Sequence, residues 1–322
     1  MAAILKRGQL PPHATPEHAQ FEVDVISGLM ADPKRIAPKY FYDAEGSRLF
    51  EEITRQPEYY PTRTEIGILR AHVGEIAKLI PPGAALVEFG SGACTKVAIV
   101  IEATALAAYV PVDISGEFLK RQAVRLAASH PRLSVHPVVT DFSKPFALPE
   151  AVKTMRKAGF FPGSTIGNFE PYDAASFLRN ACRVLGPGSL LIVGVDLVKE
   201  PEILNAAYND AAGVTAKFNL NLLRRINREL DGNFDLRKFE HHAFYNRERR
   251  RVEMHIASTM RQKVDVAGTT ASFRPGESIH TENSYKYTLG SFSALARGAG
   301  WMPQAAWTDP AHLFSVHLLR AR

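Results

Sequence analysis

Short apolar segments alternate with amphipathic helical patterns through the middle of the chain. The segments 84–89, 107–112, 135–139 and 189–195 have the length and composition of buried strands, and a weaker candidate lies at 160–162. Between these segments, apolar residues recur at helical spacing on one face. Strands that alternate with helices predict a parallel sheet covered by helices on both faces. We therefore expect an open α/β sheet.

The alternation of strands and helices ends near residue 200. Two helices follow, then several strands with apolar residues at every second position, and finally a helix at 291–298 and strands at 301–308 and 314–319. This order predicts that the chain leaves the sheet after its fifth strand, builds a second α+β lobe and returns. We expect the N-terminal helical region to join that lobe, because nothing else covers its apolar face. The expected division is a tail at 1–20, a lobe at 21–62 plus 200–285, and a sheet domain at 63–199 plus 286–322.

The composition is that of a globular protein. Apolar residues make up 46% of the 322 positions and charged residues 22%, which excludes a disordered chain. The two cysteines, Cys94 and Cys182, exclude a disulfide framework and favour a reducing compartment. Lys6 and Arg7 interrupt the apolar start, and no apolar run is long enough to span a membrane. We expect a cytoplasmic protein without a membrane partner.

The positive net charge of +6 permits nucleic-acid binding without requiring it. The densest basic cluster, 247–251, has no interleaved aromatic residues for base stacking, and it precedes a period-two pattern. We therefore expect a solvent-exposed hairpin tip at 247–251 and no nucleic-acid partner. His241 and His242 are adjacent, a spacing that does not suit a metal site, so we expect no metal.

Glycine and acidic residues follow the predicted strands at the edge where open α/β sheets bind ligands. Gly90 and Gly92 follow the first strand, Asp113 ends the second and Asp141 follows the third. Thr95 replaces the third glycine of a dinucleotide motif, and the second acid would repel a pyrophosphate. These features favour S-adenosylmethionine (SAM) over a nicotinamide cofactor. Asp113 would then bind the ribose, Asp141 would lie near the adenine amino group, and both glycines would lie beside the methionine portion.

Six longer segments carry a much more specific signal, and they occur in the order 40–50, 57–65, 163–168, 196–199, 208–216 and 281–284. In these segments the chain resembles the histidine-specific Nα-methyltransferases of ergothioneine biosynthesis, which use SAM to make hercynine, or trimethylhistidine. The resemblance extends from about Lys39 to the C-terminus. It implies a class I methyltransferase domain, with a Rossmann-like open sheet, and a separate α+β substrate-binding lobe.

The resemblance also implies roles for individual residues. The residues expected to contact the cofactor are Tyr59, Gly90, Lys96, Asp113 and Asp141. We add Gly92 from the glycine pattern and Phe142, which follows Asp141. The residues expected to bind histidine are Tyr42, Tyr59, Gly163, Asn168, Tyr208, Met254, Glu282 and Ser284.

Methyl transfer to nitrogen requires positioning of a neutral amine in line with the sulfonium methyl group, and it needs no metal. Asn168 suits this step, because its carbonyl oxygen can accept from the amine while its NH₂ donates to the substrate carboxylate. Tyr59 and Tyr208 offer hydroxyl donors to the same carboxylate. Tyr42 presents an aromatic face to the quaternary ammonium of the product. Asn168 and Tyr42 are thus the expected catalytic residues.

The imidazole ring is expected to be recognised by Glu282, which can accept from a ring N–H, and by Ser284, which can donate or accept at the other nitrogen. Met254 would line the side-chain pocket. Without the resemblance, Glu282 and Ser284 would be interpreted as solvated strand residues, and Met254 equally well as core.

The sequence leaves two rival functions open. One is a methyltransferase of the same fold that acts on another amino acid or a nucleobase, and the other is a SAM-binding module without catalysis. The main expectation is a monomeric enzyme whose ligands are SAM, its product S-adenosylhomocysteine, L-histidine and the mono- and dimethylated intermediates.

Overall fold

The computed structural model describes residues 16–92 and 95–322, and these divide into two compact units. Among the described residues, unit 1 is formed from 16–46, Ala216–His242 and Met254–Glu282, and unit 2 from Ser47–Thr215, Ala243–Glu253 and Asn283–Arg322. Of the lobe expected from the sequence, the segments 47–62, 200–215, 243–253 and 283–285 belong to unit 2. Most of the expected tail and Cys94 lie outside the described residues, whereas 16–20 form the start of a helix.

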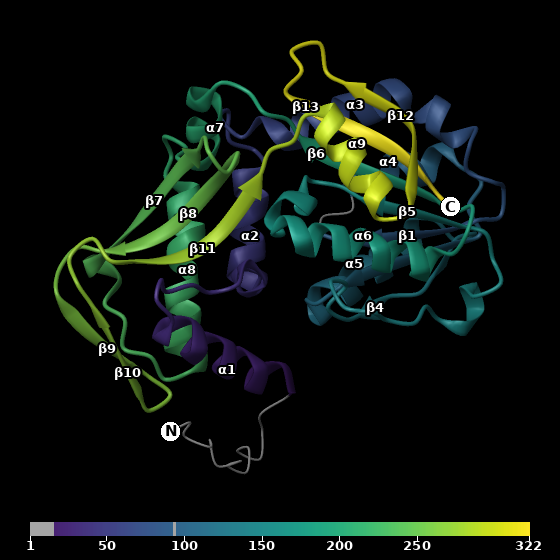
Figure 1. Cartoon of the computed structure of the whole chain (residues 1–322). Helices are drawn as coiled ribbons and strands as arrows, with labels where there is room; N and C mark the ends of the chain where they lie inside the picture. Colours follow the sequence, from purple (N-terminus) through teal and green to yellow (C-terminus); the bar gives the residue numbers. More distant parts are fainter. Residues whose placement is uncertain (1–15, 93–94) are drawn as a thin grey trace. The chain divides into compact units, whose positions relative to one another are not determined.

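An open sheet in the order β12-β13-β6-β5-β1-β2-β3 forms unit 2, and β4 also pairs with β2 (Figure 1). Its strands are β1 Ala85–Phe89, β2 Ala108–Asp113, β3 Ser134–Val135, β4 Val138–Val139, β5 Lys157–Phe161, β6 Leu190–Asp196, β12 Trp301–Thr308 and β13 Phe314–Ala321. The neighbours from β6 to β3 and β4 are parallel, whereas β13 is antiparallel to β6 and β12. The predicted open α/β sheet is confirmed.

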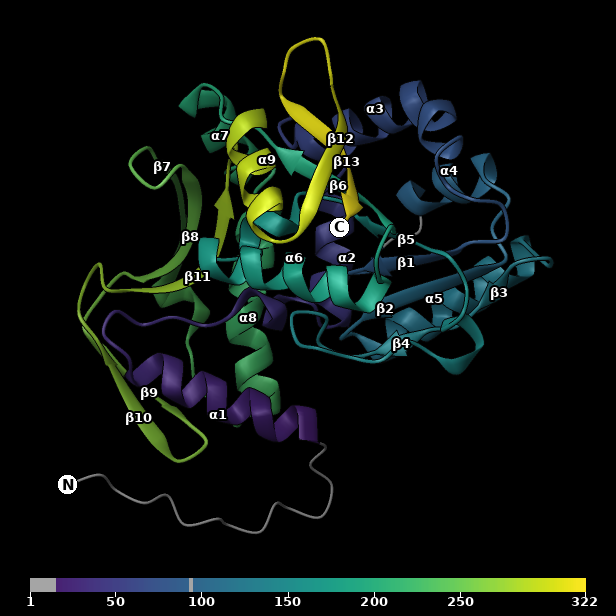
Figure 2. The ribbon, with the colours of Figure 1, turned by 45° about the vertical axis from the view of Figure 1, so that its right-hand side comes forward.

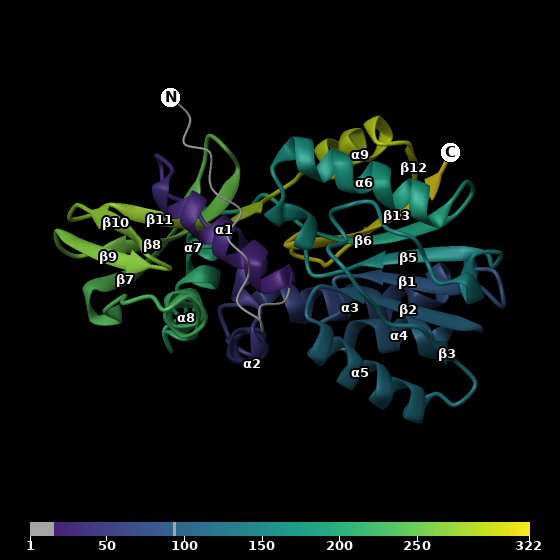
Figure 3. The same cartoon turned by 90° about the horizontal axis from the view of Figure 1, so that it is seen from below.

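Helices cover both faces of this sheet, with α6 and α9 on one face and α3, α4 and α5 on the other (Figure 3). The helices that lie wholly in unit 2 are α3 Tyr60–Ala77, α4 Thr95–Ala103, α5 Gly116–Ser129, η2 Glu150–Val152, η3 Thr165–Asn168, α6 Pro171–Leu185, α7 Pro201–Tyr208 and α9 Leu289–Gly298. Successive strand residues point to opposite faces, so Val87 and Phe89 of β1 join the core under α6 and α9 while Leu86 joins the other.

The third predicted strand differs from the prediction. In place of one strand at 135–139, the structure has two short strands, β3 and β4, with Pro137 between them. Proline has no N–H to donate to a ladder, so pairing with β2 is interrupted there and resumes at Val138. The weaker candidate at 160–162 is part of a regular buried strand, β5.

Unit 1 is built from helices and antiparallel strands (Figures 1 and 2). It contains α1 Pro16–Met30, η1 Pro38–Phe41, most of α8 Val214–Glu229, η4 Leu236–Lys238 and the hairpin β9 Gln262–Val266 with β10 Thr269–Phe273. Helix α2, Ala44–Ile53, begins in unit 1 and ends in unit 2. Within unit 1 the ring of Phe21 in α1 lies 4.7 Å from that of Tyr40, and the guanidinium of Arg225 in α8 covers Phe21 at 4.6 Å.

A separate three-stranded sheet, β11-β8-β7, contains residues of both units. Its strands are β7 Phe239–Asn246, β8 Arg251–Ser258 and β11 Ser278–Tyr285. The two helices and the strands predicted after residue 200 are therefore present as α7, α8 and β7 to β11. No helix in the described ranges has the length and apolarity that a membrane span requires.

Candidate active site

The turn after β1 brings together Gly90 and Phe142, two residues predicted to contact the cofactor. Gly90 has φ of +74°, a conformation that favours glycine, and a Cβ at this position would lie 3.4 Å from the Phe142 ring. The backbone N–H groups of Gly90 and Ser91 both donate to the carbonyl of Val112, which joins the turn to the end of β2. At Gly92 a Cβ would meet nothing within 4 Å among the described residues, so close packing does not explain that glycine.

The two predicted acids lie at the carboxyl ends of neighbouring strands. Asp113 ends β2, and its Oδ1 accepts from the backbone N–H of Ser115 at 2.8 Å. Asp141 follows β4, and its Oδ1 accepts from the backbone N–H of Ser143 at 3.0 Å. Since β2 and β4 are parallel, both carboxylates belong to the same edge of the sheet. Burial raises the pKa of Asp113.

Beneath the same turn, β1 carries a buried acid that the sequence analysis did not consider. Glu88 accepts a hydrogen bond from the Tyr109 hydroxyl, which also lies 3.0 Å from Ser91 Oγ. Burial raises the pKa of Glu88 to about 7, against the opposing effect of its hydrogen bonds with Tyr109 and Ser91.

Lys96, predicted to contact the cofactor, pairs with Glu65 at 2.6 Å. Glu65 is 1% exposed and also accepts from the backbone N–H of Gly163 at 2.9 Å. A Cβ at Gly194 of β6 would lie 1.9 Å from a Glu65 oxygen, so only glycine admits the carboxylate there. Glu65 therefore connects a cofactor residue to Gly163, a predicted substrate residue.

The segment 163–168, which follows β5, is held by close backbone packing and by hydrogen bonds that only residues such as glycine and serine allow at these positions. Gly163 and Ser164 have φ of +80° and +57°, and Ser164 Oγ accepts from the backbone N–H of Asp196 at 2.9 Å. A Cβ at Gly167 would lie 2.7 Å from the carbonyl oxygen of Tyr285. This packing fixes the backbone beside Asn168, the last residue of η3. Asn168 is half-buried, and its side chain has no hydrogen bond to any described residue.

A buried cluster of charged and phenolic groups surrounds Asp196 at the end of β6. Lys199 Nζ pairs with Asp196 Oδ1 at 2.6 Å and Lys286 Nζ with Oδ2 at 2.7 Å. The hydroxyl of Tyr60 also donates to Asp196, at 2.8 Å. Burial alone would raise the pKa of Asp196, but the two ammonium groups outweigh burial and hold that pKa below its usual value. Burial, aided by Lys286 and opposed by Asp196, lowers the pKa of Lys199 to about 8.

Two predicted substrate residues, Ser284 and Tyr208, contact Lys286 of this cluster, and a third, Tyr59, packs against Tyr208. Lys286 Nζ donates to Ser284 Oγ at 2.7 Å and to Tyr208 Oη at 3.2 Å. The rings of Tyr208 and Tyr59 are 6.4 Å apart in an edge arrangement. Unit 2 thus contains Tyr59, Gly163, Asn168, Tyr208 and Ser284, together with every predicted cofactor residue.

The other three predicted substrate residues belong to unit 1. Tyr42 packs edge-on against Phe218 at 5.8 Å. Met254 is 2% exposed, as both a pocket residue and a core residue would be. Glu282 is half-buried on β11, two residues before Ser284 and therefore on the same face of that strand. The roles of these three residues stay predictions.

The interpretation of 247–251 as an exposed tip is wrong for its last residue. Arg247, Arg249 and Arg250 are exposed in the turn before β8, but Arg251 is 4% exposed. Its guanidinium pairs with Glu170 and with Glu253, each at 2.8 Å. The charge of Arg251 is therefore balanced by two carboxylates of the protein, and its guanidinium is not exposed to solvent.

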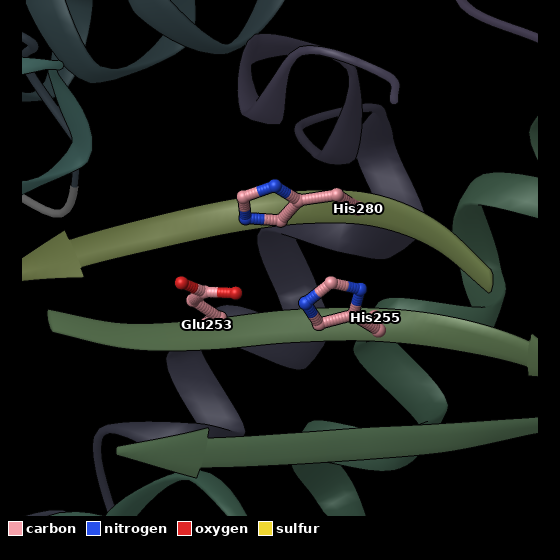
Figure 4. A group of neighbouring side chains, drawn as sticks. All are labelled: Glu253, His255 and His280. Carbon is pink, nitrogen blue, oxygen red and sulfur yellow. The ribbon is translucent and has the colours of Figure 1, made fainter. Parts of the chain in front are cut away.

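Figure 4 shows Glu253 and His255 on one face of β8, with His280 on β11. These are metal-ligating residue types, but they already have protein partners. Glu253 Oε1 accepts from Arg251 at 2.8 Å, and His255 Nδ1 lies 3.0 Å from Ser278 Oγ. The His255 and His280 rings are stacked at 4.6 Å.

Sequence reasoning missed six residues at the site: Tyr60, Glu65, Asp196, Lys199, Glu88 and Lys286. The first four lie inside segments that carry the family resemblance and Glu88 lies in a predicted strand, so their presence was visible although their contacts were not. Lys286 lies just beyond such a segment, and no local pattern distinguishes it from a surface lysine.

The glycine turn after β1, the carboxylates that end β2 and follow β4, and the aromatic ring of Phe142 fit SAM, whose adenosine offers hydroxyl and amino groups and no phosphate. Sheet order and site together define a class I methyltransferase with a Rossmann-like open sheet. A family model described as histidine-specific methyltransferase, SAM-dependent, matches residues 21–321, and the chain belongs to this family.

Curated relatives extend over nearly the whole chain. Histidine N-alpha-methyltransferase from Mycolicibacterium smegmatis is 41% identical over 302 residues, which cover 92% of this chain and 93% of that protein. Its namesake from Mycobacterium tuberculosis is 39% identical, with 94% and 95% covered. Ergothioneine biosynthesis protein 1 from Neurospora crassa is 33% identical and aligns with 89% of this chain but 33% of its own length.

Proposed function

We propose that this protein transfers three methyl groups in succession from SAM to the α-amino nitrogen of L-histidine, forming hercynine for ergothioneine biosynthesis. The observation that carries the proposal is the side chain of Asn168. It has no hydrogen bond to a described residue, and it lies at the carboxyl edge of the sheet on a backbone fixed by Gly167. An amide so placed can orient an amine that is itself a poor nucleophile. Family membership supplies the substrate class.

When SAM is bound, it would supply an electrophilic methyl carbon on its sulfonium. The neutral amine attacks this carbon in line, so that the N–C bond forms as the S–C bond breaks and S-adenosylhomocysteine leaves. Asp113 accepts from the ribose hydroxyls, Asp141 from the adenine amino group, and Gly90 and Gly92 allow the backbone to approach the ligand. Phe142 packs against adenine. Lys96 and Tyr59 bind the methionine portion, and Glu65 holds Lys96 in place.

For the amino acid, Asn168 accepts from the amine N–H and directs the nitrogen lone pair toward the methyl carbon. Tyr59, Tyr208 and the backbone of Gly163 hold the α-carboxylate. Fixing the nitrogen about 3 Å from the methyl carbon contributes several kcal/mol to catalysis. The proton that leaves the amine goes to solvent.

Glu282, Ser284 and Met254 are proposed to recognise the imidazole, and Tyr42 to stabilise the quaternary ammonium of the product. The protonated dimethylated intermediate still has one N–H from which Asn168 can accept, whereas the trimethylated product has none, and this loss favours product release. The trimethylated product should therefore bind more weakly than the dimethylated intermediate, and calorimetry with both compounds tests this order. A tighter trimethylated complex would contradict the release step.

The proposal extends to a monomeric enzyme in the cytoplasm that acts without metal, membrane or nucleic acid. These parts rest on the sequence alone. Gel filtration tests the monomeric state, and activity in the presence of a chelator tests the independence from metal.

The decisive experiment offers the purified protein SAM and each free amino acid separately, and identifies products by mass spectrometry. We expect histidine, and no other amino acid, to gain three methyl groups on its α-nitrogen. A methylated product from another amino acid would support the first rival, and SAM binding without any product would support a non-catalytic module.

A further inference from the structure

The cluster around Asp196 contains one more buried cation than anion. Lys286 is 0% exposed, Lys199 6% and Asp196 1% by side chain. Among the described residues, Asp196 is the single carboxylate that pairs with either lysine. Asp309 acts on Lys199 only at longer range, and its Oδ1 accepts from the backbone N–H groups of Leu313 and Phe314. Two ammonium groups and one carboxylate leave a positive charge in a region shielded from water.

An uncompensated buried charge is unfavourable, and proteins ordinarily avoid it by pairing or replacement. One lysine would be enough to pair with Asp196. We therefore expect the second lysine to interact with a group other than Asp196, and the remaining contacts of Lys286 indicate which group.

Lys286 directs its remaining donors at two hydroxyls. Nζ donates to Ser284 Oγ at 2.7 Å and to Tyr208 Oη at 3.2 Å, and it lies 5.0 Å from the centre of the Tyr208 ring. An ammonium group has no lone pair, so both hydroxyl oxygens must accept from it. The O–H bonds of Tyr208 and Ser284 consequently point away from Lys286, and a donor that itself accepts from a cation is polarised and donates more strongly.

We propose that Lys286 is a positioning residue that supplies the charge balanced by the substrate α-carboxylate, and that it acts through the hydroxyl of Tyr208. This inference rests on the proposed function, in which Tyr208 holds the carboxylate. Lys286 makes the tyrosine a stronger donor to an anion, and the bound carboxylate compensates the excess cation. The site thereby favours a free amino acid over an analogue without the negative charge.

The test compares L-histidine with L-histidinamide, in which a neutral amide replaces the carboxylate and the α-amine is retained. Lys286→Met keeps a long apolar side chain and leaves the Asp196–Lys199 pair intact. We expect kcat/KM for histidine to fall about 10- to 100-fold, mainly through KM, and kcat/KM for histidinamide to change less than about 3-fold. The ratio of kcat/KM for histidine to kcat/KM for histidinamide should therefore decrease, whereas the affinity for SAM stays unchanged.

Lys199→Met is the matched control. It also removes one buried lysine and leaves one ion pair, Asp196–Lys286, but it does not touch Tyr208. Whatever its overall activity, its ratio between histidine and histidinamide should stay within about 3-fold of the wild type. Equal losses on both substrates in Lys286→Met, or equal ratio changes in the two variants, would overturn the inference.

A second variant decides the matter if Lys286→Met fails to fold. Tyr208→Phe retains Lys286 and removes the hydroxyl, and we expect it to reduce the preference for histidine about 10-fold. An unchanged preference would overturn the inference. Wild-type protein that leaves histidine unmethylated contradicts the proposed function and the inference together. If wild-type protein methylates histidine but the preference survives both Lys286→Met and Tyr208→Phe, the inference and the carboxylate role of Tyr208 are contradicted while the methylation of histidine stands.

Discussion

The cofactor edge of the sheet and the cluster around Asp196 both have aspartates at the ends of strands, yet they are built in opposite ways. Asp113 and Asp141 each accept from a backbone N–H two residues further along the chain. Asp196 instead accepts from Tyr60, 136 positions away, and from two lysines. The first arrangement is local and half-buried, and the second is long-range and buried.

We infer from this difference that the acids at the cofactor edge serve ligand binding, whereas Asp196 serves the stability of the fold. A carboxylate held by its own turn and partly open to solvent is free to bind a ligand, and its replacement leaves the core intact. A carboxylate enclosed by two ammonium groups is part of the core, and its removal leaves like charges facing each other. Four substitutions test how far the contrast extends.

The largest effect is expected for Asp196→Asn. The substitution leaves Lys199 and Lys286 buried without an anion, and the free energy of unfolding should fall by about 3–5 kcal/mol. Urea denaturation measures this change. The matched control, Asp113→Asn, should lower it by less than about 1 kcal/mol. Similar losses in both variants would show that the two acids do not differ in this way.

Asn168→Ala should come next, since Asn168 lies on the segment joined to both regions. We expect kcat/KM for histidine to fall about 10²-fold because the amine is no longer oriented, with SAM affinity unchanged. Steady-state kinetics and calorimetry measure the two quantities. Asn233→Ala removes an exposed amide that bonds with Asp265 in unit 1 and should have no effect on either. A variant with normal turnover would remove Asn168 from the mechanism.

Glu88 tests whether burial, and not position at the cofactor edge, decides how an acid affects stability, because Glu88 is a buried acid at that edge. Its pKa is about 7 in the folded protein against 4.5 for the ordinary group, so the folded state binds more protons between these values. The stability that this group contributes should therefore be present below pH 4.5 and fall by about 2 kcal/mol as the pH rises to 7.

Glu88→Gln mimics the protonated acid at every pH. Denaturation curves of wild type and Glu88→Gln should thus diverge between pH 4.5 and 7, with the variant more stable at the higher pH. Parallel pH profiles would show that Glu88 titrates normally.

The smallest effect is expected for Asp113→Asn on ligand binding. An amide accepts from ribose hydroxyls less strongly than a carboxylate, and the Kd for SAM should rise about 10-fold with little change in histidine KM. Calorimetry measures the first. Asp173→Asn, an exposed acid in the first turn of α6, is the control and should bind SAM normally. A larger loss of histidine than of SAM binding would contradict the assignment of Asp113 to the cofactor.

Much of the fold could be predicted because its signals are local. Apolar runs identified β1, β2 and β6, and helical spacing identified α6, since burial on one or both faces leaves a periodic trace. The single strand expected at 135–139 failed for a local reason, the missing N–H of Pro137.

The candidate site was predictable to the extent that its residues stand at strand ends or inside segments with a family resemblance. Gly90, Asp113 and Asp141 belong to the first kind, and Gly163 and Asn168 to the second. Arg251 was misjudged, because a basic cluster gives no sign of which member meets Glu170 from another part of the chain.

The sequence by itself determined the open sheet, the acids at its edge and the family, because periodicity and motif order depend on neighbours along the chain. Only the tertiary structure decided that Asp196, Lys199 and Lys286 share one buried volume with Tyr60 and Tyr208. Charges separated by scores of residues meet when β6, α7 and the end of β11 pack together, and no local pattern encodes the low dielectric that gives them their strength.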